Sequence, residues 1–168
     1  YIRIKAIDRV GNDSNWSNSG SKVVDIDPPS VPGQPGTTSP TADNTPAWTW
    51  AGSTDNGVGL DENPYMIEWS QNSGFLSGVS SDAIDQTNFT HVTPLADGTW
   101  YFRVRAVDDV GNMSNYSSMG TVFVDASDPS DPGTPATISP TTDNTPTWAW
   151  TASSDGSGTG LATNAYVV

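Results

Sequence analysis

The chain has 168 residues, a formal net charge of −13 at pH 7, 16 glycines, 13 prolines and no cysteine. The negative charge argues against nucleic acid and anionic membranes as partners, since both would repel the surface, and the lack of cysteine excludes a disulfide framework and a thiolate metal site. The apolar runs fall well short of the roughly 18 residues that a membrane-spanning helix needs, so membrane insertion is not expected.

The first segment of the chain returns in its second half. Residues 1–8 read YIRIKAID and residues 101–108 read YFRVRAVD, and 11 of the first 20 residues are identical 100 positions later. Residues 28–50 have the same relation to residues 128–150, with 15 of 23 identical. A period of 100 residues is too long for a solenoid unit and suits a small domain that folds independently. The sequence therefore predicts tandem modules.

Alternation of apolar and polar residues predicts strands along the whole chain, and no segment has helical spacing. Glycine, asparagine and aspartate supply turns between the strands. Strands at intervals of roughly 10–20 residues with turns between them indicate an antiparallel β-sandwich, here of seven strands. In chain order, the expected strands cover residues 1–8, the Trp48–Trp50 region, and residues 65–69, 88–92, 100–106 and 120–125.

The alternation also predicts which side chains are buried. His91 is ambiguous, because the parity counted from Phe89 and from Val92 places it on opposite faces. Trp16 is the one tryptophan expected to be exposed, whereas Trp148 and Trp150 are expected in a core. The expected core of the central module comprises Trp48, Trp50, Tyr65, Ile67, Trp69, Trp100, Phe102, Val104 and Ala106.

One stretch of the chain resembles a known family. Residues 95–108, LADGTWYFRVRAVD, are similar to a corner and the following strand of fibronectin type III domains and related bacterial immunoglobulin-like modules. The resemblance implies an all-β fold of immunoglobulin-like antiparallel sandwiches in tandem. At this corner Trp100 stands where such sandwiches use a tyrosine hydroxyl, so the sequence leaves open how the corner is held. Similar turns of the form Asp-x-x-Gly-Asn-x-Ser lie at residues 8–14 and 108–114.

The repeats and the proline-rich segments divide the chain into three parts. We expect residues 1–27 to be the last two strands, F and G, of a preceding repeat, residues 28–127 to be a complete repeat, and residues 128–168 to be strands A to C of the following repeat. The proline-rich linkers between them are expected to be semi-rigid, because proline fixes φ. Each end segment alone leaves open sheet edges and half a core. Neighbouring copies or repeats of the same protein are therefore expected to pack head to tail.

No set of residues predicts catalysis. His91 is the only histidine, and Glu62 and Glu68 are the only glutamates. A glycosidase would need two carboxylates that face one cleft, whereas Glu62 falls in an expected loop and Glu68 alternates outward. The sequence predicts a protein that is not an enzyme and requires no cofactor.

Aspartates are the one group with the chemistry of a metal site. Ca²⁺ takes six to eight oxygen ligands, which clustered Asp and Asn side chains and backbone carbonyls supply. Aspartate is also an ordinary turn residue, and no segment matches the twelve-residue calcium loop, so both interpretations stay open. The candidate ligands recur near the linkers and are Asp8, Asp25, Asp27, Asp108, Asp125 and Asp128.

These features predict a structural or adhesive repeat of a secreted or cell-surface bacterial protein, forming an extended stalk or a head-to-tail filament. The alternative is a spacer or glycan-contacting accessory module of a secreted hydrolase. A surface glycan or protein is the expected external ligand. Flanking sequence would separate the two hypotheses, because further copies favour a stalk and a catalytic domain favours the accessory module.

Overall fold

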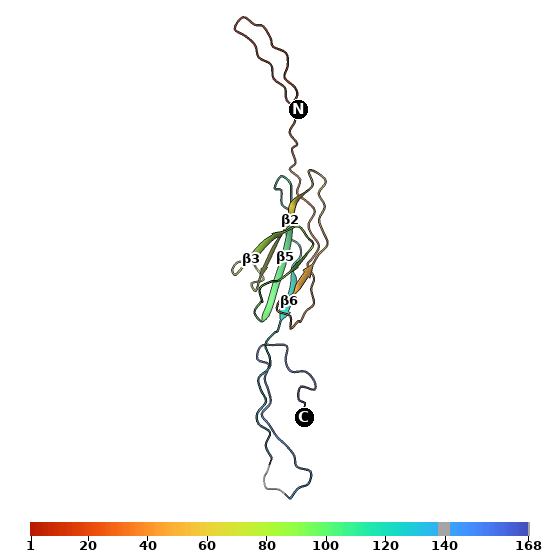
Figure 1. Ribbon diagram of the computed structural model, residues 1–168, viewed down its shortest axis with the longest axis vertical. Coiled ribbons are helices and arrows are strands. Elements are labelled where there is room, and N and C mark those ends of the chain that lie inside the picture. The colour runs from red at the N-terminus through yellow and green to blue at the C-terminus, as the bar shows by residue number, and fades with distance from the viewer. Residues whose placement is uncertain (138–141, 168) are drawn as a thin grey trace.

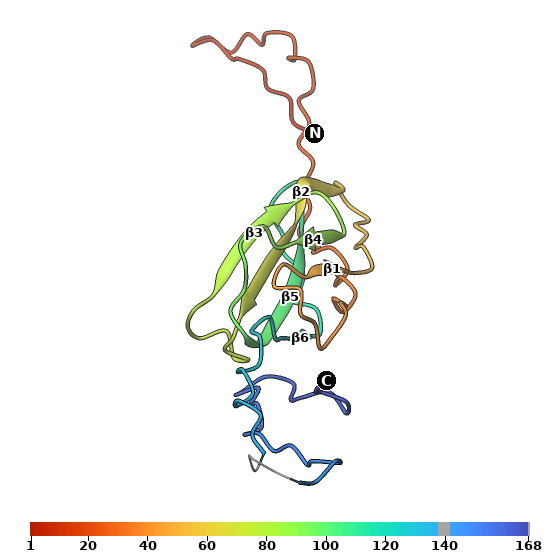
Figure 2. The same cartoon turned by 60° about the horizontal axis from the view of Figure 1, so that its bottom comes forward.

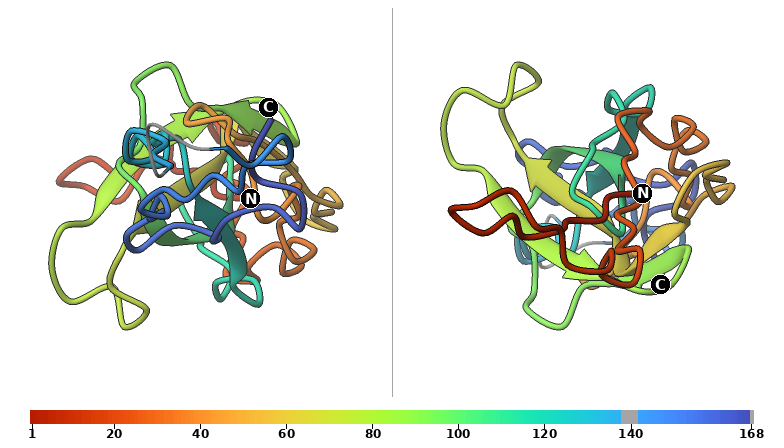
Figure 3. Two further views of the ribbon diagram at one scale, coloured as in Figure 1. Left: turned by 90° about the horizontal axis from the view of Figure 1, so that it is seen from below. Right: turned by 90° about the horizontal axis from the view of Figure 1, so that it is seen from above.

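A central β-sandwich is flanked by two extended segments (Figure 1). The computed structural model describes residues 1–137 and 142–167. A long hairpin made by the first residues projects from one end of the sandwich, and the residues after 125 project from the other. In the end-on views of Figure 3 both flanking segments largely overlie the sandwich, so the three parts follow one another along the long axis. The described residues include no helix with the length and apolar character to cross a membrane.

Two antiparallel sheets form the sandwich (Figure 2). The larger sheet has the strand order β3–β2–β5–β6, and the smaller pairs β1 with β4. The expected all-β, immunoglobulin-like antiparallel fold is confirmed. Glu62, expected in a loop, instead belongs to β2, whose register with β5 shifts between Leu60 and Tyr65. The strands are β1 Ala47–Thr49, β2 Leu60–Ser70, β3 Ser80–Ile84, β4 Asn88–Thr90, β5 Gly98–Asp108 and β6 Gly120–Val124.

The sandwich has six named strands rather than seven, because its opening segment is irregular. Residues 30–36 run beside residues 49–54, but their N–H groups bond to that neighbour only at Ser30, Gly33 and Gly36. Prolines recur at every third residue there. Proline has no N–H to donate, so a continuous ladder cannot form along this edge.

Most of the expected core is buried. Trp69 and Trp100 are exceptions, since they are only half-buried and pack against the rim of the core. Trp48 stacks on Phe102 with ring centroids 4.8 Å apart. Gly120 permits this packing, because a Cβ there would lie 2.7 Å from the Trp48 ring. The buried apolar residues are Trp48, Trp50, Tyr65, Ile67, Leu95, Phe102, Val104, Ala106, Val122 and Val124.

An indole holds the corner before β5. The Nε1–H of Trp100 donates to the carbonyl of Ala96 over 2.8 Å, four residues upstream. A tyrosine hydroxyl makes the equivalent backbone bond in other immunoglobulin-like sandwiches. The corner that the sequence left open is therefore closed by an indole N–H in place of a hydroxyl.

The N-terminal hairpin keeps the local bonds of the matching hairpin between β5 and β6. The N–H of Ser14 donates to the carbonyl of Ala6, and the N–H of Ala6 donates to the Ser14 hydroxyl over 2.9 Å. Ser114 and Ala106 make the same pair of bonds in the sandwich. The local conformation of this hairpin therefore does not depend on a surrounding core.

The C-terminal segment likewise keeps the contacts of its counterpart. The N–H of Ser153 donates to the hydroxyl of Tyr166 over 2.9 Å, as Ser53 does to Tyr65 over 3.0 Å. The ring of Trp150 lies edge-on to Tyr166, with centroids 5.5 Å apart. The copy of the Ser39–Trp50 motif begins within residues 138–141, which lie outside the described residues.

Two tryptophans expected in a core are exposed instead. Trp148 is 56% exposed and Trp150 is 37% exposed, whereas Trp48 and Trp50 are buried. The reason is that β5 and β6, whose side chains cover Trp48 and Trp50, have no counterpart after residue 150 in this sequence. Trp16 is exposed, as expected.

Candidate functional site

Three aspartates meet at the end of the sandwich that carries the N-terminal hairpin. Asp25 comes from the linker, Asp55 from the loop between β1 and β2, and Asp108 from the end of β5. One carboxylate oxygen of each lies within 4.8 Å of the other two. Asp25 and Asp108 are among the ligands that the sequence predicts, whereas Asp55 is not, although its recurrence as Asp155 is a signal that could have found it.

N–H donors already hold these carboxylates in place. The N–H of Val58 donates to Asp25 over 2.8 Å, and a Cβ on Gly57 would collide with the Asp25 carboxylate. Asp108 is fully buried and accepts three N–H bonds, two of them from Asn112. The Asn112 side chain also donates to the Asp25 carbonyl over 3.3 Å. Linker, loop and turn therefore form one connected junction.

Hydrogen bonds keep Asp108 ionised despite its burial. Burial raises the pKa of this carboxyl, but the bonds from Asn112 and from the turn N–H groups outweigh it and hold the pKa below the ordinary value. Three carboxylates at this distance suit a cation such as Ca²⁺, and they contribute three of the six to eight oxygens it takes. The N–H donors are the competing means of neutralising the same charges.

The following junction repeats two of the three aspartates. Asp125 accepts the N–H of Thr159 over 2.5 Å, as Asp25 accepts that of Val58. Among the described residues, the other oxygen of Asp125, Oδ1, is buried without a hydrogen-bond partner. Asp125 lines a hollow of about 440 Å³ together with Asp128 and Asp155.

The carboxylates of Asp8 and Asp27 lie apart from both groups. Asp8 is the repeat counterpart of Asp108 and accepts bonds from Asn12 and Val10 in an exposed turn. The bonds from Asn12 lower the pKa of Asp8. Asp27 is exposed in the linker, and its backbone N–H donates to Asp25 Oδ1 over 3.1 Å. The geometry thus groups Asp25 with Asp108, and Asp125 with Asp128, and leaves the carboxylates of Asp8 and Asp27 outside.

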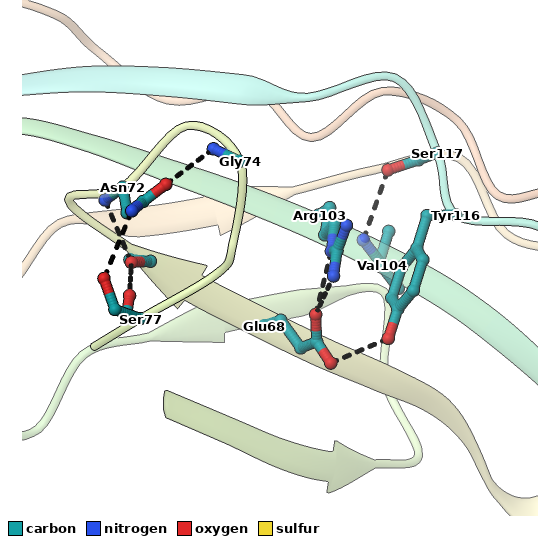
Figure 4. Close-up of polar contacts among 9 residues, drawn as sticks. Glu68, Asn72, Gly74, Ser77, Arg103, Val104, Tyr116 and Ser117 are labelled. Carbon is teal, nitrogen blue, oxygen red and sulfur yellow. Dashed lines mark hydrogen bonds and ion pairs between the residues drawn. The ribbon is translucent and has the colours of Figure 1, made fainter. Parts of the chain in front are cut away.

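The outer face of the larger sheet carries an ion pair of Glu68 and Arg103 beside the ring of Tyr116 (Figure 4). Arg103 donates to Glu68 through Nε and Nη2, and the Tyr116 hydroxyl donates to the other carboxylate oxygen over 2.7 Å. The guanidinium lies 4.0 Å from the centre of the Phe75 ring and 3.9 Å from that of Tyr116. Burial raises the pKa of Glu68, but these bonds and the charge of Arg103 outweigh it, so the group stays ionised. Glu68 therefore has no proton to give as a general acid at neutral pH.

His91 faces inward and lies against the core. The Nε1–H of Trp48 donates to His91 Nε2 over 3.2 Å. Because an indole nitrogen can only donate, the neutral imidazole must carry its proton on Nδ1. Burial lowers the pKa of His91 to about 4. The ring stands edge-on to Trp69 and Phe89. His91 therefore lies on the inward face, which the alternation in the sequence left open.

No family model matches the sequence, and no curated protein matches it. The sixth fibronectin type III domain of human fibronectin type III domain containing protein 3 is 24% identical over 68% of this chain and 99% of that domain, with a TM-score of 0.45. A Fn3-like protein from Clostridium thermocellum is 22% identical over 58% of this chain and 95% of that one, with a TM-score of 0.44.

A larger protein also contains a similar part. A beta-1,2-glucanase from Parabacteroides distasonis is 17% identical over 68% of this chain, with a TM-score of 0.38, and the match spans 16% of the glucanase. These similarities concern the fold alone.

Proposed function

We propose that the chain is a non-enzymatic structural and adhesive segment of a secreted or cell-surface bacterial protein. Copies of one sandwich follow one another head to tail in an extended stalk or filament. The observation that carries the proposal is the reuse of the same contacts in residues 1–27, 28–127 and 128–167, described above. Reuse of one scaffold suits extension and spacing.

The two flanking segments are complementary halves of one sandwich. Residues 1–27 correspond to the hairpin of β5 and β6, and residues 128–167 correspond to the strands that this hairpin covers. Ile2 and Ile4 are 72% and 69% exposed, although their counterparts Phe102 and Val104 are fully buried. Packing the halves of neighbouring copies together would remove this apolar surface from water, which is favourable.

Both junctions fix the linkers against the sandwich. At one end Asp25 bonds to the loop after β1, and at the other Asp97 accepts the N–H of Ala126 over 2.9 Å. Bonds from Ser127 and Ala126 lower the pKa of Asp97. Proline in each linker further limits its conformations. Linkers held in this way suit a stiff spacer, because adjacent sandwiches keep a defined orientation.

Sedimentation equilibrium of the 168-residue chain tests the packing of the ends. We expect self-association that Ile4→Asp abolishes, because the substitution places a charge on the apolar face of the hairpin. Val10→Asp is the matched control, since Val10 is 84% exposed and its counterpart Val110 is still 53% exposed in the complete sandwich. A chain that stays monomeric at high concentration would contradict packing between separate copies.

We further propose that Ca²⁺ binds the aspartates at the linker junction and stiffens it. A ligand of the folded state raises its melting temperature by mass action. Millimolar Ca²⁺ should therefore raise the melting temperature, and a chelator should reverse the change. Asp55→Asn should abolish this difference, whereas Asp85→Asn, an exposed residue outside the junction, should leave it intact. Equal melting temperatures with Ca²⁺ and with chelator would contradict the proposal.

The non-enzymatic role has its own test. The purified chain should hydrolyse no glycan, peptide or ester, because Glu68 is committed to Arg103 and His91 to Trp48. Turnover that disappears in Glu62→Gln would overturn this part of the proposal.

A further inference from the structure

Two hollows beside β3 share the indole of Trp100 as a common wall. The first has a volume of about 370 Å³ and lies between β3 and residues 89–95, where the two sheets part. The second has a volume of about 510 Å³ and lies at the turn after β2, which Figure 4 shows in part. Both volumes fall in the range of small-ligand sites, ≈300–1,000 Å³. Neither hollow belongs to the aspartate junction.

A buried hydrogen-bond donor faces the first hollow. His91 is 4% exposed, and its Nε2 is occupied by the indole N–H of Trp48, which leaves the proton on Nδ1. Within the described part of the chain, no atom accepts this proton. His91 lines the first hollow, so its Nδ1–H is a donor that a ligand there can reach. A ligand oxygen at this point would accept this hydrogen bond in place of water.

The charges around the first hollow select an uncharged ligand. Asp82 on β3 brings a carboxylate to the rim, and the chain carries a formal charge of −13, so an anion is repelled. The aromatic rings and Asp82 would suit a cation, but the inward Nδ1–H of His91 points the positive end of its dipole at any cation there. A neutral molecule with hydroxyl groups suits both His91 and Asp82, since a hydroxyl accepts a hydrogen bond from His91 and donates one to Asp82.

The remaining lining fits one face of a sugar ring. Trp100, Phe89 and Leu95 present apolar surface, and the negative face of an indole attracts the C–H groups of a ring laid against it. The second hollow continues beyond Trp100 with polar groups. Gln71 donates to the Asp97 carbonyl through Nε2, while its Oε1 has no partner among the described residues and is free to accept a hydroxyl.

We propose that the two hollows form a binding site for a neutral carbohydrate chain, with one pyranose ring stacked on Trp100 and one of its hydroxyls bonded to His91 Nδ1–H and Asp82. The site adds a ligand to the adhesive role proposed above. The two claims fail separately, because Ile4→Asp disrupts association and leaves these residues untouched.

Titration of the ¹⁵N-labelled chain with cellotetraose, laminaritetraose, chitotetraose and mannotetraose tests the site. We expect at least one of these sugars to shift the indole N–H signal of Trp100 and the imidazole signals of His91. Asp82→Ala should weaken that binding about tenfold, the loss of one charge-assisted hydrogen bond. Asp85→Ala, an exposed carboxylate outside the hollow, is the matched control and should bind as the unaltered chain does.

Four outcomes would overturn the proposal. The first is that none of the four sugars at millimolar concentration shifts the Trp100 and His91 signals. The second is that Asp82→Ala and Asp85→Ala weaken sugar binding equally. The third is choline shifting the same signals more strongly than the sugars, because this would mean a cation site. The fourth is a proline-rich peptide displacing a bound sugar with higher affinity, because this would mean a peptide groove.

Discussion

Replacing Trp48 with phenylalanine should be far more damaging than the same change elsewhere in the chain. Trp48 is 1% exposed, stacks on Phe102 and gives its N–H to His91. Loss of part of the ring leaves a small cavity, which should lower the free energy of unfolding by about 1–2 kcal/mol, as in other large-to-small core changes. The imidazole Nε2 also loses its only donor, at a further cost of about 1–3 kcal/mol for a buried group left unpaired.

The combined loss is about 3 kcal/mol, which for a domain of this size lowers the melting temperature by roughly 15 °C. Urea unfolding followed by circular dichroism measures it. Trp148→Phe is the repeat-matched control, since Trp148 is 56% exposed, and it should stay within about 0.5 kcal/mol of the unaltered chain. Trp50→Phe is a second control. The buried Nε1 of Trp50 has no partner among the described residues, so its removal leaves no acceptor unpaired.

A double-mutant cycle isolates the hydrogen bond from the cavity. In the Trp48→Phe background, His91→Leu should cost less than it does alone, because no unpaired acceptor remains to be penalised. Equal losses for Trp48→Phe and Trp50→Phe, together with additive effects in the cycle, would refute the assignment of this bond as a stabilising contact.

Three further predictions concern other parts of the sandwich. The folded-state pKa of His91 lies near 4, below its ordinary value of 6.5, so the unfolded chain binds a proton that the folded chain does not. The free energy of unfolding should therefore fall as the pH drops from 6.5 toward 4, by about 2 kcal/mol at pH 5. Urea midpoints at pH 7 and pH 5 measure this loss, and the same loss in His91→Gln would show that another group causes it. Trp100→Phe removes the bond to Ala96 and should cost about 1 kcal/mol, a change that calorimetry detects and that a neutral result would contradict. Gly57→Ala should displace the Asp25 carboxylate, which lies where the new Cβ would be, and so speed amide exchange at Val58; unchanged exchange would show that the contact does not hold the linker.

The sequence predicts the strands and most of the core because both follow from short-range pattern. Period-2 alternation identified β5 and the buried side chains Phe102 and Val104. It gave the wrong burial for Trp148 and Trp150, because alternation states which face a residue takes and not whether another sheet covers that face. It also predicted one strand too many, since the prolines of residues 30–36 remove the donors that a ladder requires.

The candidate site was less predictable, because its members come from distant parts of the chain. Asp25, Asp55 and Asp108 lie on a linker, a loop and a strand end, and only the fold brings them within one cluster. The role of His91 had the same difficulty. Its partner Trp48 is 43 residues away, and parity within its own short strand pointed in two directions. The corner indole of Trp100 was missed for a chemical reason, since the sequence interpretation considered only a hydroxyl as the donor.

The N-terminal hairpin separates the two kinds of force that hold a repeat together. Its bonds within the hairpin are complete without a core, but the edge of residues 1–8 that matches the β2-facing edge of β5 still has a ladder to form with a neighbouring copy. The apolar face is also uncovered, with Ile2 and Ile4 exposed. A net hydrogen bond contributes about 1 kcal/mol, and burying one such side chain contributes about 1.5–3 kcal/mol. Packing between ends should therefore be driven mainly by apolar burial, weaken on cooling and persist in salt. The aspartate junction depends on charge and should weaken as salt rises, so the two contributions can be told apart by temperature and ionic strength.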